Sequence, residues 1–305
     1  MRVRVLGSAA GGGFPQWNCG CANCRGLRRG SVRAWPRTQD SLAVSQDGAS
    51  WFLLNASPDV RAQLAATPAL EPRARRHTPI CGIVLSNGDL DHGLGLFSLR
   101  EAQPLALYAT RAVQRGLREH NAFCRTLERF AGHTRWTALE PGVRCALLGA
   151  DAQPSGLSVE AIAAPGKLPI HLEGLLEPSA EDNVALAIHD EQRRRTLVYA
   201  PSVAARTPAL ESALREADCV LFDGTFWSGD ELPGLGLGER SAQDMAHWPV
   251  GGPDGSLAWL AALPGRTLLT HVNNTNPLLI EDSAERRAVE AAGVEVAYDG
   301  MELEP

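Results

Sequence analysis

The chain has 305 residues, of which 44% are hydrophobic and 21% are charged, and its formal net charge is -6. This length and composition are typical of a soluble globular protein with a sizeable core. No apolar run approaches the roughly 18 residues that a membrane-spanning helix needs, and the N-terminal stretch is too short in apolar residues for a secretory signal. The sequence therefore predicts a cytoplasmic protein that is not embedded in a membrane.

Charge is distributed unevenly along the chain. Residues 1–150 contain 19 Lys and Arg against 10 Asp and Glu, whereas residues 151–305 contain 10 against 25. Lys167 is the only lysine, and no basic run is interleaved with aromatic residues, which argues against nucleic acid as a partner. Two halves of opposite charge attract each other, and an anion-binding surface in the first half is the alternative interpretation. We expect a single domain over residues 1–305.

Strand and helix patterns alternate along the chain. Short apolar, β-branched or aromatic runs predict strands at residues 3–7, 51–55, 81–86, 105–109, 157–163, 183–188, 196–200, 218–222, 266–270 and 294–298. Helical periodicity predicts helices at 57–66 and 207–217, which begin at Ser57 and Thr207 as N-caps, and at 283–293, which ends at Gly293. This alternation predicts an α/β fold.

Polar side chains follow three of the predicted strands directly. Asn87 follows the strand predicted at 81–86, Asp223 follows the strand at 218–222, and His271 follows the strand at 266–270. Ligand sites of α/β proteins gather at the carboxyl ends of the strands. We therefore expect these three residues to converge on one site, although they are far apart in the sequence.

Three motifs carry a family resemblance: "NGDLDHG" from Asn87, "FDGTFW" from Phe222 and "THVNNTNP" from Thr270. In this order they resemble the metallo-β-lactamase fold superfamily. The resemblance implies an αββα sandwich of two mixed β-sheets flanked by helices. It also implies that Asn87 and Asp89 replace the two leading histidines of one metal position. Four residues then correspond to the ligands of the other position: Asp91, His92, Asp223 and His271.

The chemistry of these four ligands bears on the ion. Two carboxylates and two imidazoles contain no thiolate and leave two positions of an octahedron free. Iron(II) or manganese accepts such a set with open positions for O2 and substrate. Zinc with one bound water is the alternative, and spacing alone does not separate the two.

Longer blocks resemble the family of pyrroloquinoline quinone (PQQ) biosynthesis protein B. They include "GSAAGGGFPQWNCGCANC", "RTQDSLAVS", "LLNASPDVR" and "SNGDLDHGLGL", and with the motifs above they extend from Gly7 to Pro277. The resemblance implies an Fe2+- and O2-dependent hydroxylase of the tyrosine-derived ring in a Glu-Tyr cross-linked precursor of PQQ. Asp89 is then a candidate base for the phenolic proton, and the alternatives are that it orients His92 or caps the loop. Asp40 departs from the small residue expected at its position.

The segment "CGCANC" brings Cys19, Cys21 and Cys24 within reach of one ion. Three thiolates on a short loop predict a structural Zn2+ site that needs a fourth ligand. A phosphodiesterase of the superfamily closes a similar cluster with a histidine, and the matching position here is Asn274. His247 is the other candidate.

Three functions remain open: an iron oxygenase, a metal-dependent hydrolase, and a carrier of PQQ toward the periplasm. In the first, the expected partners are a small Glu-Tyr-derived substrate and other PQQ biosynthesis proteins. The sequence also allows a homodimer. The order of the hydroxylations and the electron donor are not fixed by sequence.

Overall fold

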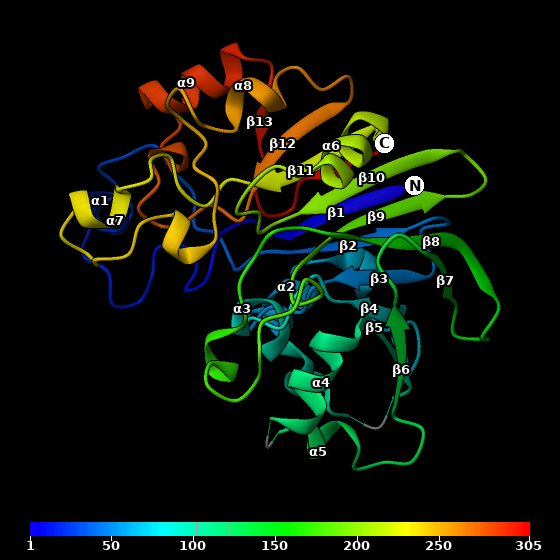
Figure 1. Cartoon of the computed structure of the whole chain (residues 1–305). Coiled ribbons are helices and arrows are strands. Elements are labelled where there is room, and N and C mark those ends of the chain that lie inside the picture. The colour runs from blue at the N-terminus through cyan, green and yellow to red at the C-terminus, as the bar shows by residue number, and fades with distance from the viewer. Residues whose placement is uncertain (102, 122) are drawn as a thin grey trace.

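A computed structural model of the chain describes residues 1–101, 103–121 and 123–305, and it contains two seven-stranded β-sheets (Figure 1). The strands of the first sheet are β1 (Arg2–Gly7), β2 (Ser41–Ser45), β3 (Trp51–Leu54), β4 (Ile80–Val84), β5 (Leu105–Thr110), β6 (Thr134–Leu139) and β14 (Glu302–Leu303). Their order is β14-β1-β2-β3-β4-β5-β6. Pairing is antiparallel from β14 to β3 and parallel from β3 to β6.

The second sheet repeats this mixed plan. Its strands are β7 (Arg144–Leu148), β8 (Pro154–Ala163), β9 (Val184–Asp190), β10 (Arg195–Ala200), β11 (Cys219–Asp223), β12 (Arg266–Thr270) and β13 (Glu295–Val296). Their order is β13-β12-β11-β10-β9-β8-β7. Strands β7 to β10 pair antiparallel, and β10 to β13 pair parallel. The predicted architecture of two mixed sheets is therefore confirmed.

Helices cover the outer face of each sheet (Figure 1). The α-helices are α1 (Ala22–Arg29), α2 (Val60–Ala65), α3 (Leu90–Gly93), α4 (Arg111–Glu119), α5 (Cys124–Leu127), α6 (Pro208–Glu216), α7 (Glu231–Gly234), α8 (Leu257–Leu260) and α9 (Ala284–Ala291). The 3-10 helices are η1 (Pro68–Leu70), η2 (Leu94–Leu99), η3 (Ile170–Leu172), η4 (Gln243–Met245) and η5 (Pro277–Leu279). Helices α2 to α5 lie beside the first sheet, and α6, α8 and α9 beside the second. Within the described residues, no helix is long and apolar enough to cross a membrane.

Strand β11 shows how the layers are packed. Cys219 and Leu221 face the core between the two sheets, whereas Val220 and Phe222 face the helices on the outer side. Side chains alternate between the faces of a strand, and both faces of this strand are buried. A strand that is buried on both faces has a continuous apolar run in its sequence, and this run predicted β11.

Two of the three expected helix ends are confirmed. The Thr207 side chain accepts a hydrogen bond from the Leu210 backbone N–H at the start of α6. Gly293, with φ of 78°, directly follows the C-cap residue of α9, and its N–H donates to the Glu290 carbonyl oxygen. The helix predicted from Ser57 begins only at Val60. Here Ser57 Oγ accepts from the Asp59 backbone N–H, and this local turn delays the helix.

The sequence patterns missed several elements. Strands β2, β6, β7 and β14 and helix α4 lie outside all the predicted segments. Strands β6 and β7 lie at the edges of their sheets and are only partly buried. They therefore lack the continuous apolar runs of the central strands.

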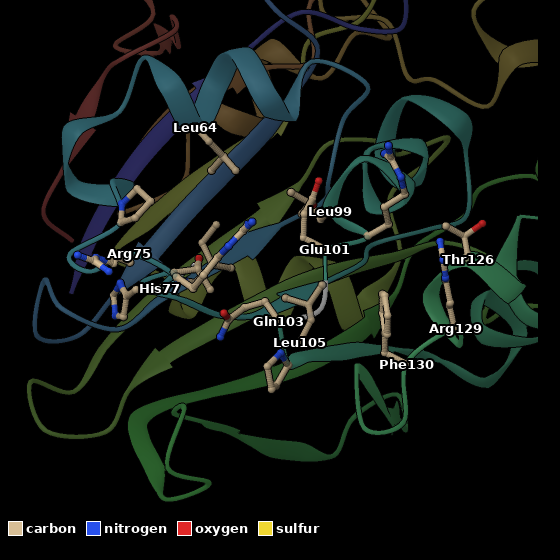
Figure 2. A pocket seen from close by; sticks show the side chains of 16 residues that line it. Leu64, Arg75, His77, Leu99, Glu101, Gln103, Leu105, Thr126, Arg129 and Phe130 are labelled. Atoms are coloured by element: carbon tan, nitrogen blue, oxygen red, sulfur yellow. Dashed lines mark hydrogen bonds between the residues drawn. The ribbon is translucent and has the colours of Figure 1, made fainter.

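The two ends of β4 have different surroundings. Its carboxyl end leads into the "NGDLDHG" segment and α3. At its amino end, Ile80 and the first residue of β5, Leu105, line a cavity of about 700 Å³ (Figure 2). The fold therefore separates this cavity from the predicted metal residues by the length of the strand.

Candidate metal centre

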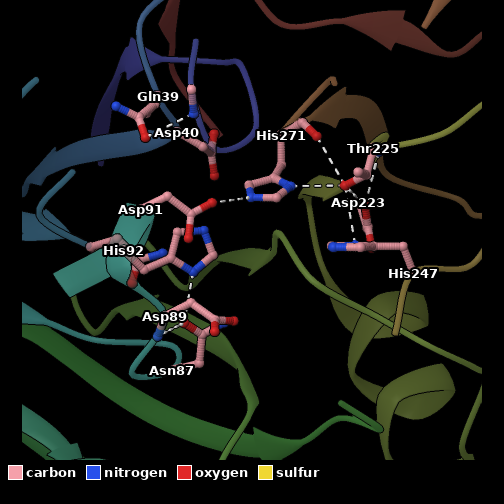
Figure 3. A network of polar contacts seen from close by, with 12 residues as sticks. Gln39, Asp40, Asn87, Asp89, Asp91, His92, Asp223, Thr225, His247 and His271 are labelled. Atoms are coloured by element: carbon pink, nitrogen blue, oxygen red, sulfur yellow. Dashed lines mark hydrogen bonds and ion pairs between the residues drawn. The ribbon is translucent and has the colours of Figure 1, made fainter. Parts of the chain in front are cut away.

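Helix α3 presents Asp91 and His92 toward the second sheet (Figure 3). It is a single turn, in which the His92 and Gly93 backbone N–H groups both donate to the Asp89 carbonyl oxygen. The Ala56 N–H donates to the His92 carbonyl, and the Gly95 N–H donates to the Ala56 carbonyl. These bonds fix the turn against the segment that follows β3.

Asn87 orients the His92 ring. Asn87 Oδ1 lies 2.8 Å from His92 Nδ1 and also accepts from the Asp89 backbone N–H. Because an amide oxygen only accepts, His92 must carry its proton on Nδ1. Its Nε2 atom then has a free lone pair, and this buried atom has no hydrogen-bond partner among the described residues. A buried imidazole nitrogen in this state suits a metal ligand.

The second sheet delivers Asp223 and His271 to the same edge. Asp223 ends β11 and pairs with Thr270, the last residue of the parallel neighbour β12. His271 has φ of 56°, in the left-handed region. Non-glycine residues held in this region cluster at functional sites, and here Thr225 Oγ1 lies 3.0 Å from the His271 carbonyl oxygen and 2.8 Å from its Nδ1.

A chain of hydrogen bonds sets the orientation of His271. Asp223 Oδ1 lies 2.6 Å from Thr225 Oγ1. The threonine hydroxyl can donate its single proton to this carboxylate and accept from His271 Nδ1–H. His271 Nε2 then faces Asp91 Oδ2 at 3.2 Å. When His271 is neutral in this tautomer, both atoms carry lone pairs, an arrangement that a shared cation would stabilise.

The predicted ligands fall into two overlapping groups. Potential ligand atoms of Asp91, His92 and His271 all lie within 4.8 Å of one another, and so do those of Asp223, His247 and His271. Both carboxylate oxygens of Asp223 are engaged by protein groups. Oδ2 contacts the Val203 N–H at 2.8 Å and His247 Nδ1 at 2.7 Å, while Oδ1 contacts Thr225. Asp223 is thus linked to the first group by hydrogen bonds that run through Thr225 to His271.

The charges of the first group are tightly linked. Burial lowers the pKa of His92 to about 4, so this ring is neutral at pH 7. Burial alone would raise the pKa of Asp91, but His92 and His271 hold it well below its usual range. Burial would likewise lower the pKa of His271, but the hydrogen bond and charge of Asp91 raise it to about 9. In the metal-free protein protonated His271 therefore balances the charge of Asp91, and a cation that displaces this proton can bind to Asp91, His92 and His271.

Asp89 lies beside this group with its carboxylate free. Its side chain makes no cap hydrogen bond to α3 and no hydrogen bond or ion pair within the described part of the chain. Burial, followed by the charge of Asp91, raises the pKa of Asp89 to about 6. Asn87, and not Asp89, is the residue that orients His92.

Sequence reasoning overlooked the roles of Thr225 and Asp40. Thr225 lies in the quoted "FDGTFW" motif, so the signal was present. Asp40 is fully buried, accepts a hydrogen bond from Tyr199 and lies 2.5 Å from Thr270 Oγ1. It therefore supports the end of β12 just before His271, a role for which the sequence offers only the unexpected carboxylate.

The cysteine cluster is brought together as predicted. Ligand atoms of Cys19, Cys21 and Cys24 lie within 4.8 Å of one another. Asn274 Nδ2 lies 3.1 Å from Cys19 Sγ and 3.3 Å from Cys24 Sγ. His247 lies instead with Asp223 and stacks on His271, with ring centroids 5.4 Å apart. Of the two candidates for a fourth ligand, the structure places Asn274 against the thiols.

Comparison with known proteins agrees with these features. A family model described as the β-lactamase superfamily domain matches residues 50–272. The coenzyme PQQ synthesis protein B of Azotobacter vinelandii is 44% identical, with 100% of both chains covered. That of Cupriavidus necator is 45% identical and covers 99% of this chain and 98% of its own. The chain belongs to the coenzyme PQQ synthesis protein B family.

Solved structures agree with the assignment of this chain to the PQQ synthesis protein B family. The crystal structure of Zn2+-bound PqqB from Methylobacterium extorquens is 40% identical, covers 100% of both chains and has a TM-score of 0.91. A diphosphatase of the PhnP family has a TM-score of 0.69 at 19% identity and shares the fold. The resemblance inferred from the sequence motifs is therefore confirmed for both the fold and the family.

Proposed function

We propose that this protein is an iron(II)- and O2-dependent hydroxylase of PQQ synthesis. Its substrate would be the tyrosine-derived ring of the Glu-Tyr cross-linked precursor. The observation that carries the proposal is the group formed by Asp91, His92 and His271. Two imidazoles and one carboxylate with open positions are the ligand set of non-haem iron(II) oxygenases.

The side chains around this group have distinct tasks. Asn87 and Thr225 hold the two rings so that His271 Nε2 faces Asp91 and His92 Nε2 has no hydrogen-bond partner among the described residues. When bound, iron(II) would supply the redox chemistry that the reaction with O2 requires. That Asp223 also binds the ion stays a prediction, and its present contacts support a role in orienting Thr225 and His247.

Asp89 is the proposed acceptor of the phenolic proton. A base must reach the proton with a carboxylate that is not already engaged. Asp89 meets this condition because no side-chain partner within the described residues occupies it. Removal of the proton makes the ring electron-rich, which favours oxygen insertion.

The proposed reaction is a hydroxylation that uses both oxygen atoms of O2. One oxygen atom of O2 enters a ring C–H bond as a hydroxyl group, and the other leaves as water. Two protons and two electrons from a two-electron reductant complete the second product. We further propose a structural Zn2+ at Cys19, Cys21 and Cys24, with Asn274 beside it.

One observation favours a metal-dependent hydrolase as the second candidate. Asp223, His247 and His271 form another group of potential ligands that shares His271 with the first. Two adjacent ions would suit hydrolysis, in which one activates water. Carriage of PQQ toward the periplasm, a cytoplasmic location, partners among other PQQ synthesis proteins and a homodimer stay predictions from the sequence.

The two enzyme candidates differ in their need for oxygen. We expect anaerobically prepared, iron-loaded protein to consume O2 and add oxygen atoms to a tyrosine-derived diacid when a reductant such as ascorbate is present. Oxygen uptake and the product mass measure this directly. Asp91→Asn should abolish both signals. Product formation without O2, or no turnover with O2, iron and reductant all present, would refute the hydroxylase proposal.

A further inference from the structure

The cavity at the amino ends of β4 and β5 is separate from the metal centre. None of the residues that line it belongs to the two groups of potential metal ligands. Strand β4 has five residues, so its two ends lie roughly 13 Å apart. A ligand in this cavity would therefore bind at a second site.

Cationic side chains surround the cavity. Four arginines line it, namely Arg75, Arg76, Arg100 and Arg129. Within the described residues no carboxylate forms an ion pair with any of them, although elsewhere on the surface arginines are commonly paired, as Arg266 is with Glu295. Glu101 is the single carboxylate in the lining. The lining therefore carries a net positive charge that the chain does not neutralise.

The middle of the cavity is apolar. Ile80 and Leu105 are 6% and 7% exposed, and they form its floor together with Leu64 and Leu99. Figure 2 shows Arg75 and His77 at one end of the lining and Arg129 and Phe130 at the other. The Arg129 guanidinium lies 5.4 Å from the centre of the Phe130 ring, which holds it at the wall of the cavity.

We infer that this cavity binds an elongated dianion, specifically a dicarboxylate whose two charges are separated by an apolar body. Arginine pairs with carboxylates through two parallel hydrogen bonds, so cations at both ends match a charge at each end of the ligand. The apolar floor matches the body between them. A volume of about 700 Å³ lies within the range of small-molecule sites.

The test uses simple α,ω-dicarboxylates as probes. Adipate, suberate and sebacate are titrated into the metal-loaded full-length protein by isothermal titration calorimetry, with octanoate as the probe that has one charge. We expect the longer diacids to bind more tightly than octanoate. In an Arg75→Gln/Arg129→Gln variant the dissociation constant should rise about tenfold or more, because each substitution removes charge-assisted hydrogen bonds to a carboxylate of the ligand.

Two matched variants complete the test. Arg29→Gln removes an exposed arginine of α1 that does not line the cavity, and it should leave diacid binding unchanged. Asp91→Asn should also leave it unchanged, which separates this site from the metal centre and from the proposed reaction. All four arginines of the lining are exposed, so their replacement should not disturb the fold. Unchanged thermal unfolding will show that the variants are folded.

Three outcomes would overturn the inference. The first is the absence of diacid binding at millimolar concentration, including the case in which only an acidic peptide such as polyglutamate binds. The second is equal weakening by Arg29→Gln, which would indicate general charge attraction. The third is loss of binding in Asp91→Asn, which would place the diacid at the metal centre.

Discussion

Asn87 orients His92, and the resemblance to the superfamily implies a metal-binding histidine at its position. The Asn87 amide oxygen accepts from His92 Nδ1 at 2.8 Å and from the Asp89 backbone N–H. One asparagine thereby fixes both the His92 ring and the start of α3.

Replacement of Asn87 tests this assignment. We expect Asn87→Ala to weaken iron binding by about 10- to 100-fold, the usual cost of losing a residue that orients a metal-bound histidine. Asn87→Asp keeps an acceptor oxygen and should recover most of the affinity. Anaerobic iron titration measures both constants. Equal affinity in Asn87→Ala and the native protein would contradict the assignment.

Asp40 gives the metal-free protein a dependence on pH. Burial raises its pKa from 3.8 to about 6, so the folded chain holds a proton that the unfolded chain releases. Stability attributable to this group is therefore present at low pH and is lost as the pH rises from about 4 to about 6. Asp40→Asn removes this loss, while its amide can still bond to the hydroxyl groups of Tyr199 and Thr270.

Thermal unfolding of the metal-free proteins measures this effect. The melting temperature of Asp40→Asn minus that of the native protein should be larger at pH 8 than at pH 4.5. A difference that is the same at both values, or that has the opposite trend, would show that Asp40 is charged in the fold at every pH tested.

At the scale of elements, the loop after β12 connects the two predicted metal sites. It carries His271 at one end and Asn274, beside the cysteines, three residues later. Asn23 of α1 donates hydrogen bonds to the carbonyl oxygens of Asn274, Thr275 and Asn276. The cysteine segment therefore holds the loop that presents His271.

Loss of a cysteine should affect both sites. We expect Cys21→Ser to lose zinc, to unfold at a lower temperature, and to bind iron more weakly because His271 is held less firmly. Cys145→Ser, a partly buried cysteine of β7, is the control and should retain zinc. Metal analysis together with thermal unfolding measures these effects. A Cys21→Ser protein that keeps its zinc would disprove the structural site.

Gly95 allows η2 to pack closely on the segment after β3. A Cβ atom at this position would overlap the carbonyl oxygens of Ser57 and Ala56. Gly95→Ala should therefore lower the free energy of unfolding by roughly 1–3 kcal/mol. Gly234→Ala has open space around it and should change stability little. Chemical denaturation of the two variants compares them, and equal stabilities would contradict the close approach.

Most strands that are buried on both faces could be predicted from the sequence, whereas exposed edge strands could not. Strand β2 was missed although all its residues are buried, because its end residues, Ser41 and Ser45, shorten its apolar run. Strand β11 was evident because every residue from Cys219 to Asp223 is buried. The single turn of α3 is too short to show helical periodicity, and it brings ligand atoms of Asp91 and His92 within 4.8 Å of each other. Likewise, the positive φ of His271 arises from tertiary contacts with Thr225.

At the scale of the whole molecule, the centre lies where the two sheets meet. Its residues come from α3 beside the first sheet and from the carboxyl ends of β11 and β12 in the second. The Val184 N–H donates to the Ser86 carbonyl and so joins the sheets next to the "NGDLDHG" segment. Motif order revealed this convergence, but the division of the ligands between two groups needed the geometry. The single-domain organisation stays a prediction.

The most direct test of the account is to locate the ion. Crystals of anaerobically iron-loaded protein, measured at the iron absorption edge, should show one iron bonded to Asp91, His92 Nε2 and His271 Nε2. An ion held by Asp223 and His247, with His92 unbound, would contradict the single-ion centre proposed here.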